Sequence, residues 1–338
     1  MTSKETIEII EHIHRNDPDL KHIDLSNQIS TLSQIYLLSE ALKINTTLRM
    51  LCLNHNDLEN CPDPSGMKLL SEALKVNKTL QTLYLHGNNL GNCPAGMNSL
   101  SEALKVNTSI RELWLLHNNL GKYHEGMKFL SEALKVNNTL QKLVLIHNNL
   151  WGCPEGVISL SEALKVNKTL QMLDLSYNKL GDRPDGGKSL SEALKVNKTL
   201  RELSLNCNDL GKSPEGMYFL SEALKVNNSL QELDLNNNNL GGCHDGVKSL
   251  SEALKINKTL KILNLWNNNL RNCPKGMKSL LETLKCDSVI QNILVCFNDL
   301  DKSVIFEIQD ILARNKHNNL MKNSCLFGLL LPILDSSF

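Results

Sequence analysis

One pentapeptide recurs along almost the whole chain. Ser-Glu-Ala-Leu-Lys occurs in eight copies, 30 residues apart except for a first interval of 32, and a degenerate ninth copy, Leu-Glu-Thr-Leu-Lys, occupies residues 281–285. A fixed period of this length predicts a solenoid, in which each unit buries its apolar side against its neighbours. The intact copies begin at Ser39, Ser71, Ser101, Ser131, Ser161, Ser191, Ser221 and Ser251.

Each unit carries a second block, in which apolar and polar residues alternate. Residues 80–90 read Leu-Gln-Thr-Leu-Tyr-Leu-His-Gly-Asn-Asn-Leu, and this alternation predicts a strand with one buried face. The pentapeptide that follows lies on a helical apolar stripe with Met97, Leu100 and Leu104. A weaker tenth copy begins at Leu20, with its asparagine displaced to Asn27. The nine clear copies begin at Leu48, Leu80, Ile110, Leu140, Leu170, Leu200, Leu230, Leu260 and Ile290.

An asparagine closes each strand block. Backbone inside a protein needs hydrogen-bond partners, so we predict that these amides bond the turns of their own and neighbouring units and bind no ligand. A second asparagine, such as Asn107, ends each helix, and we expect it to be a left-handed cap. The strand-end asparagines are Asn56, Asn88, Asn118, Asn148, Asn178, Asn208, Asn238, Asn268 and Asn298.

The combined pattern L-x-x-L-x-L-x-x-N-x-L is the leucine-rich-repeat signature. With a helix after every strand, the chain resembles the ribonuclease-inhibitor-like subfamily, which includes the repeat regions of NOD-like receptors and of Ran GTPase-activating protein. The resemblance implies an α/β horseshoe-shaped solenoid, with parallel strands on the concave face and helices on the convex face. We expect a capping helix at 1–19, about ten repeats at 20–300 and a second cap at 301–338.

Charge balance and the length of the apolar runs exclude some kinds of binding partner. The 338 residues contain 36 Lys and Arg against 36 Asp and Glu, a balance that argues against nucleic-acid binding. No apolar run has the length that a bilayer span requires, so we expect no membrane contact and a cytoplasmic location. Cysteines are then expected to be free thiols, including those that recur in the loops at Cys61, Cys93, Cys153, Cys243 and Cys273.

The sequence carries no motif for phosphate binding, zinc hydrolysis or a nucleophile elbow. We therefore expect no enzyme, no catalytic residue, no cofactor and no metal. His86, His117 and His147 lie in neighbouring units, where we expect a solvated row rather than a metal site. The resemblance leaves two alternatives, a GTPase-activating protein of the Ran type and a regulatory module like those of innate-immune sensors. The chain lacks the acidic tail that the first implies.

The units differ most at exposed strand positions. The residue between the two strand leucines changes from Tyr84 to Trp114 to Asp174, while the helix block hardly changes. Drift at unconstrained positions would produce this pattern, and so would a ligand surface. The distribution of aromatic residues favours the second reading, because exposed aromatics commonly anchor protein interfaces. Five of the aromatic residues fall on this face: Tyr84, Trp114, Tyr177, Trp266 and Phe297.

We predict a binding site on the concave face, where the chain acts as a monomeric scaffold for a protein partner. The apolar residues of the site lie in adjacent units, polar residues form its rim, and Trp266 is a further predicted contact. A polar, acidic stretch follows at Asp174, Glu202, Glu232 and Asp234. Residues 326–334 are expected to cover the last leucine layer, with a partner or membrane contact as the alternative. The predicted site comprises Tyr84, Trp114, Leu116, Val144 and Ile146, rimmed by Glu112, His117 and Lys142.

Overall fold

The computed structural model describes residues 3–58, 65–286 and 289–315. The strands are β1 (His22–Asp24), β2 (Met50–Cys52), β3 (Thr82–Tyr84), β4 (Glu112–Trp114), β5 (Lys142–Val144), β6 (Met172–Asp174), β7 (Glu202–Ser204), β8 (Glu232–Asp234), β9 (Ile262–Asn264) and β10 (Asn292–Leu294). The α-helices are α1 (Ser3–His14), α2 (Leu32–Ile44), α3 (Ser65–Val76), α4 (Pro94–Val106), α5 (His124–Val136), α6 (Pro154–Val166), α7 (Pro184–Val196), α8 (Pro214–Val226), α9 (His244–Ile256) and α10 (Pro274–Lys285). Short 3-10 helices precede six of them: η1 (Leu90–Asn92), η2 (Leu150–Gly152), η3 (Leu180–Asp182), η4 (Leu210–Lys212), η5 (Leu240–Gly242) and η6 (Leu270–Asn272). Residues 302–315 are also helical.

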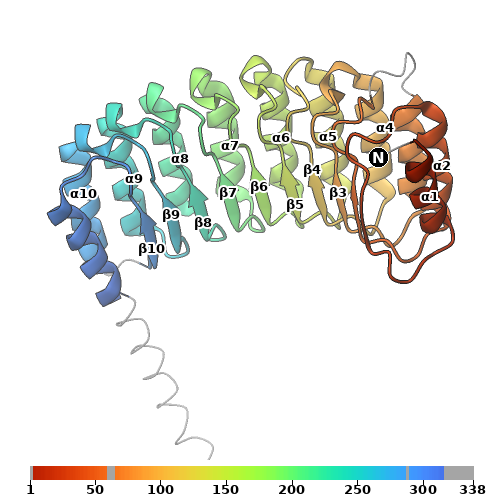
Figure 1. Ribbon diagram of the computed structural model, residues 1–338. Coiled ribbons are helices and arrows are strands. Elements are labelled where there is room, and N and C mark those ends of the chain that lie inside the picture. The colour runs from red at the N-terminus through yellow and green to blue at the C-terminus, as the bar shows by residue number, and fades with distance from the viewer. Residues whose placement is uncertain (1–2, 59–64, 287–288, 316–338) are drawn as a thin grey trace, which may run out of the picture.

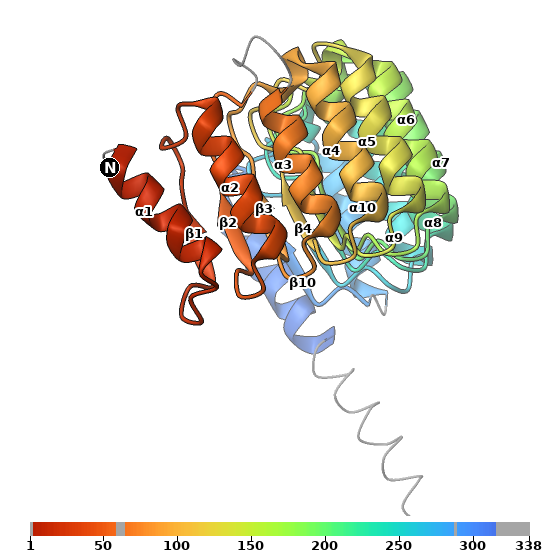
Figure 2. The same ribbon diagram turned by 90° about the vertical axis from the view of Figure 1, so that its right-hand side faces the viewer.

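The ten strands form one parallel sheet in sequence order, from β1 to β10. Figure 1 shows the sheet on one side of the molecule and the helices on the other, with α1 and α10 near opposite ends. Figure 2 shows successive helices stacked as an outer layer. The predicted alternation of strand and helix and the parallel pairing of neighbouring units are therefore confirmed.

The register of the parallel strands places equivalent positions of successive repeats side by side. Leu83 of β3 pairs with Leu113 of β4, which pairs with Leu143 of β5, and all three are fully buried. Each strand is only three residues long, because the chain turns immediately after its second leucine. Each position of the repeat therefore forms a row across the sheet, and the outward rows carry the residues that differ between units.

The helices bury one face and leave a charged face in water. In α4 the residues Leu100, Ala103 and Leu104 are buried, and Pro94 occupies the first turn, where its missing N–H has no helical partner. Glu102 and Lys105 form an ion pair on the exposed face. Since both side chains are partly solvated, such a pair contributes at most about 0.5 kcal/mol, and burial of the apolar face holds the helix in place.

The predicted asparagine ladder is confirmed. The Asn118 Oδ1 accepts hydrogen bonds from the backbone N–H groups of Asn88 (3.0 Å) and Leu90 (3.3 Å) in the preceding unit. Its Nδ2 donates to the carbonyls of Leu85 (2.8 Å) and Leu116 (3.1 Å). Each amide therefore satisfies buried backbone groups on both sides of a unit boundary and fixes the spacing of the turns.

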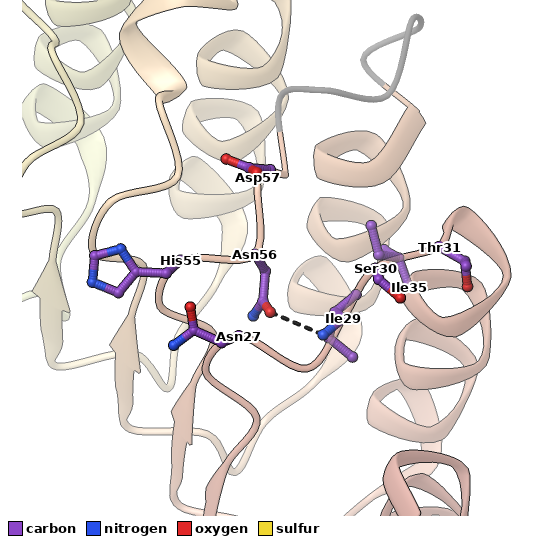
Figure 3. A pocket seen from close by; sticks show the side chains of 8 residues that line it. All are labelled: Asn27, Ile29, Ser30, Thr31, Ile35, His55, Asn56 and Asp57. Carbon is purple, nitrogen blue, oxygen red and sulfur yellow. Dashed lines mark hydrogen bonds between the residues drawn. The ribbon is translucent and has the colours of Figure 1, made fainter. Parts of the chain in front are cut away.

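The first rung corrects the prediction for the weak tenth copy. Gln28, and not Asn27, occupies the ladder position, and its N–H donates to the Asn56 Oδ1 at 2.8 Å. The same oxygen accepts from the N–H of Ile29 at 2.9 Å, beside a hollow of about 350 Å³ that His55 also lines (Figure 3). Asn27 instead has a left-handed backbone, with φ of 58°.

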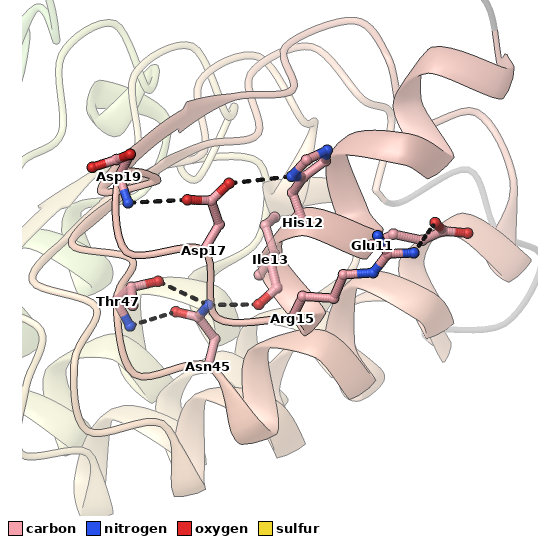
Figure 4. Close-up of polar contacts among 8 residues, drawn as sticks. All are labelled: Glu11, His12, Ile13, Arg15, Asp17, Asp19, Asn45 and Thr47. Carbon is pink, nitrogen blue, oxygen red and sulfur yellow. Dashed lines mark hydrogen bonds and ion pairs between the residues drawn. The ribbon is translucent and has the colours of Figure 1, made fainter.

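The prediction of a left-handed cap at Asn107 is wrong. Its backbone is extended, with φ of −70° and ψ of 134°. This conformation lets the side chain form a second ladder: Nδ2 donates to the Leu74 carbonyl at 2.6 Å, and Oδ1 accepts from the N–H of Ile110 at 2.8 Å. Figure 4 shows the first rung, where Asn45 donates to the Ile13 carbonyl at 2.6 Å and so attaches α1 to the array.

Left-handed residues lie instead in the turns after the strands. From the second unit onward two residues per turn have positive φ, as at His117 (52°) and Asn119 (55°). Only Gly87 is a glycine among them. A non-glycine residue is uncommon in this region, and the neighbouring ladder bonds hold the backbone there. The variable column that contains His117, His147 and Tyr177 therefore belongs to a turn and not to a strand.

Candidate protein-binding surface

Two aromatic rings form the centre of the predicted site. Tyr84 and Trp114 are register partners on β3 and β4, with ring centroids 5.2 Å apart. The Lys142 ammonium lies 4.4 Å from the Trp114 ring centroid, within the range of a cation–π interaction. The indole Nε1 donates to the Glu112 Oε2 at 3.2 Å. The indole is therefore held in place by neighbours on both adjoining strands, while its surface stays partly exposed.

The structure brings most of the predicted residues together on neighbouring strands. Leu116 and Ile146 follow β4 and β5, and both remain partly exposed. We call the following set the Trp114 patch: Tyr84, Glu112, Trp114, Leu116, His117, Lys142 and Ile146.

The expected exposure is wrong at Val144. This side chain is 0% exposed, and its register partners on the two neighbouring strands are the larger Trp114 and the charged Asp174. A short branched side chain between two longer ones has no free surface. Val144 is therefore a buried neighbour of the patch, and its side chain offers no contact to a partner in this structure.

Histidines border the patch on the turn side. The rings of His117 and His147 meet edge to face at 4.4 Å, and His86 lies beside Tyr84 at 5.6 Å. Burial lowers the pKa of His86, and the neighbouring His55 and His117 lower it further. The Nε2 of His86 is buried without a hydrogen-bond partner. His86 is therefore less solvated than the sequence suggested, whereas His117 and His147 are exposed as expected. Among the described residues no cluster of three or more metal-ligand side chains occurs.

The concave face becomes acidic beyond the patch. Asp174, Glu202, Glu232 and Asp234 line a shallow hollow of about 330 Å³ that extends from β6 to β10. Burial raises the pKa of Asp234, and the nearby Asp174 raises it further, against a hydrogen bond from the N–H of Asn236. Burial, followed by the charge of Glu202, likewise raises the pKa of Glu232. The hollow thus concentrates negative charge where solvation is incomplete.

Positive charge gathers at the edge where the strands begin. Arg111, Lys168, Lys198 and Arg201 line a groove of about 520 Å³ there, together with threonine and amide side chains. Within the described parts of the chain, none of these four cations has a carboxylate within ion-pair distance. Sequence reasoning missed this groove, because it did not combine the repeat position of Arg111 and Arg201 with that of Lys168 and Lys198.

Trp266 lies apart from the Trp114 patch. It follows β9, five strands further along the sheet, and its ring meets Phe297 edge to face at 5.3 Å. Both side chains are exposed, as is Leu294 on the last strand. Trp266 therefore belongs to a separate aromatic pair near the C-terminal end of the sheet, and the shared variability of its column was the signal that found it.

Three of the five loop cysteines lie inside the array. Cys153, Cys243 and Cys273 are buried, and the eight described cysteines are all free. Cys61 and residues 326–334 fall outside the described residues. Among the helices that are described, none combines the length and the apolar character needed to cross a bilayer.

A match to a family model supports the repeat architecture. A family model described as Leucine Rich Repeat matches residues 229–250, and no curated protein matches the chain. The solved structure of leiomodin-1 actin-binding site 2 is similar at 22% identity and a TM-score of 0.37, over 46% of this chain and 88% of that one. The tropomodulin C-terminal domain from Caenorhabditis elegans is similar at 16% identity and a TM-score of 0.36, over 47% of this chain and 93% of that one.

A third similar structure is that of the TLR13–ssRNA13 complex, at 16% identity and a TM-score of 0.32, over 76% of this chain and 37% of that one. At these identities and scores, the three structures say nothing about function. The periodic sequence, the single parallel sheet and the matching repeat model together make this chain an α/β leucine-rich-repeat solenoid.

Proposed function

We propose that the chain is a non-enzymatic, monomeric scaffold that binds a protein partner through the Trp114 patch. One observation carries the proposal: a tryptophan held between a cation and a carboxylate lies partly exposed on the most variable face of an otherwise uniform array. Ordered aromatic side chains lose little conformational freedom on binding and dominate the energetics of many protein interfaces.

Two finer points accompany this proposal. The repeats are of the ribonuclease-inhibitor-like type, which the regular alternation of a short strand with a helix of 12 or 13 residues supports. The protein works in a reducing compartment such as the cytoplasm, for which the free thiols of the buried loop cysteines are the support.

The test compares two variants that each remove one exposed aromatic ring. Trp114→Ala alters the patch, and Tyr218→Ala alters the outer surface of α8, where the tyrosine is 51% exposed. Quantitative affinity purification with the wild-type protein first identifies candidate partners. Binding of the purified partner is then measured by calorimetry. Loss of an interface anchor costs at least about 2 kcal/mol, so we expect Trp114→Ala to weaken binding by about thirtyfold or more.

Tyr218→Ala should leave the affinity within about twofold, since a residue outside the interface contributes little to binding. Circular dichroism of both variants checks that they fold. Equal affinity of the wild-type protein and folded Trp114→Ala for every purified partner would overturn the placement of the site.

A further inference from the structure

One helix of the array lacks an apolar side chain that its neighbours possess. The position in question follows the glycine in the first turn of each helix, and in α7 it is Gly187. In the other helices from α3 to α10 the residue is a methionine or valine that is at most 5% exposed. These residues are Met67, Met97, Met127, Val157, Met217, Val247 and Met277.

The surroundings of the first-turn glycine in the following helix show that a side chain is missing beside α8. A Cβ atom added to Gly126 would lie 3.5 Å from the Met97 side chain of the preceding helix, and one added to Gly246 would lie 2.7 Å from Met217. At Gly216 of α8 the same construction meets no atom within 4 Å. The methionine or valine that would fill this space is replaced by Gly187, which also has open space around its own Cβ direction.

The vacancy between α7 and α8 is apolar and reaches the surface. Five leucines line it together with glycines, Pro184 and two serines, and in this described region no charged side chain takes part. The leucines are 3–6% exposed, whereas Leu150, Leu175, Leu235 and Leu250, at the same positions of other units, are 0–1% exposed. The space open to the centre of a water-sized sphere is about 20 Å³. The five wall leucines are Leu180, Leu190, Leu205, Leu210 and Leu220.

We propose that this vacancy, the Gly187 pocket, binds a short linear apolar molecule with the size and chemistry of a methionine side chain. Replacing methionine by glycine removes more atoms than the leucine-to-alanine changes that create ligand-binding cavities in other cores. A cavity lined by leucine stays dry and takes up small apolar molecules, because water finds no hydrogen-bond partners there. A thioether or short alkyl chain restores the contacts that the repeat makes elsewhere, while the apolar walls exclude ions.

Ethyl methyl sulfide, which reproduces most of a methionine side chain, is the direct probe. Its oxidised form, ethyl methyl sulfoxide, has the same carbon skeleton and a polar oxygen. Binding is followed through the leucine methyl resonances of the full-length protein and through the melting temperature, which a ligand of the folded state raises by mass action. We expect the sulfide to shift the methyl resonances of Leu205 and Leu210 and to raise the melting temperature. The sulfoxide should do neither.

Matched variants locate the binding. Gly187→Met fills the pocket with the side chain usual in the other units, and we expect it to weaken sulfide binding by at least about tenfold. Gly242→Met adds the same side chain at an exposed turn where nothing lies within 4 Å of the Cβ direction, and it should bind the sulfide like the wild-type protein. If Gly187→Met does not fold, Gly187→Ala serves as the blocking variant, since even one methyl group reduces the space.

These experiments distinguish a ligand-binding pocket from a gap in the packing that binds nothing. Absence of any response of the wild-type protein to the sulfide would overturn the proposal, even if Gly187→Met is more stable. Equal responses to sulfide and sulfoxide, or equal binding by Gly187→Met or Gly187→Ala and the wild-type protein, would also overturn it. None of these variants touches the Trp114 patch, so the outcome is independent of the proposed partner site.

Discussion

At the scale of single residues, two sets of buried amides connect each unit to the one before it. The strand-end set bonds the turns, and the helix-end set bonds the last helical carbonyls of the preceding unit. A buried backbone group that loses its partner costs about 1–3 kcal/mol. Each asparagine satisfies several such groups, so these side chains stabilise the fold far more than their exposed polar neighbours do.

Asn148→Ala should therefore lower the free energy of unfolding by roughly 3 kcal/mol. The side chain accepts from the N–H groups of Asn118 and Leu120 and donates to the carbonyls of Leu115 and Ile146. Urea unfolding at neutral pH measures the change. Asn138→Ala, at an exposed position nearby, is the control and should cost less than about 0.5 kcal/mol. Similar losses for the two variants would contradict a structural role of the ladder.

The buried imidazole of His86 predicts a dependence of stability on pH. Its pKa is lowered in the folded protein, so the unfolded chain takes up the proton first as pH falls. Stability present above the ordinary histidine pKa of about 6.5 is lost as pH falls toward the folded value. His86→Gln should show a smaller decrease in unfolding free energy between pH 7.5 and 5.5 than the wild-type protein. His244→Gln, at an exposed helix start, should leave the slope unchanged; the prediction is wrong if both variants share the wild-type slope.

The first ladder could be predicted from the sequence, because an asparagine at a fixed place beside buried turns needs a backbone role. The second could not be separated from a left-handed cap by residue type alone. What distinguishes the ladder from a cap is the bonding of the side chain: the Asn107 Oδ1 accepts hydrogen bonds from the N–H groups of Ser109 and Ile110. Exposure of Val144 was misjudged because the size of its neighbours across the sheet, and not its place in the repeat, decides how much surface it keeps.

At the scale of elements, helix α1 packs against the first repeat, as the predicted capping role would require. Ile10 and Ile13 are buried there, and α1 packs on α2. Periodicity predicted the type and order of the elements, because core leucines repeat at positions that only one register satisfies. The 3-10 turns could not be predicted in this way, since they depend on how one unit packs against the next. The glycine at Gly187 is visible in the sequence, but the open space beside it depends on how α8 packs against α7.

Ile13→Ala should lower the free energy of unfolding by about 3 kcal/mol, since it opens a cavity under the terminal helix. Among the described helices α1 packs mainly on α2, so it can open without the rest of the array. Hydrogen exchange should therefore show a greater loss of protection in α1 than in α5. Ile7→Ala, at a partly exposed position of the same helix, should have a clearly smaller effect. Equal loss of protection along the whole chain would contradict local opening.

At the scale of the whole molecule, the concave face is divided into regions of different chemistry. An aromatic patch covers β3 to β5, an acidic hollow extends from β6 to β10, and cations gather along the edge where the strands begin. The zero net charge of the chain conceals this separation, because helical Glu–Lys pairs contribute both signs equally on the outer face. A partner that follows the sheet would therefore meet these regions in a fixed order along the array.

The ladders also give the array a direction. Each strand-end oxygen accepts from the unit before it, and no unit could be reversed without leaving those N–H groups unbonded. A complete unit inserted in the same orientation would continue both ladders and move every later surface residue by one strand, with the backbone conformation unchanged. Duplication or deletion of whole repeats can therefore change the order of the surface regions, while each repeat keeps its own side chains.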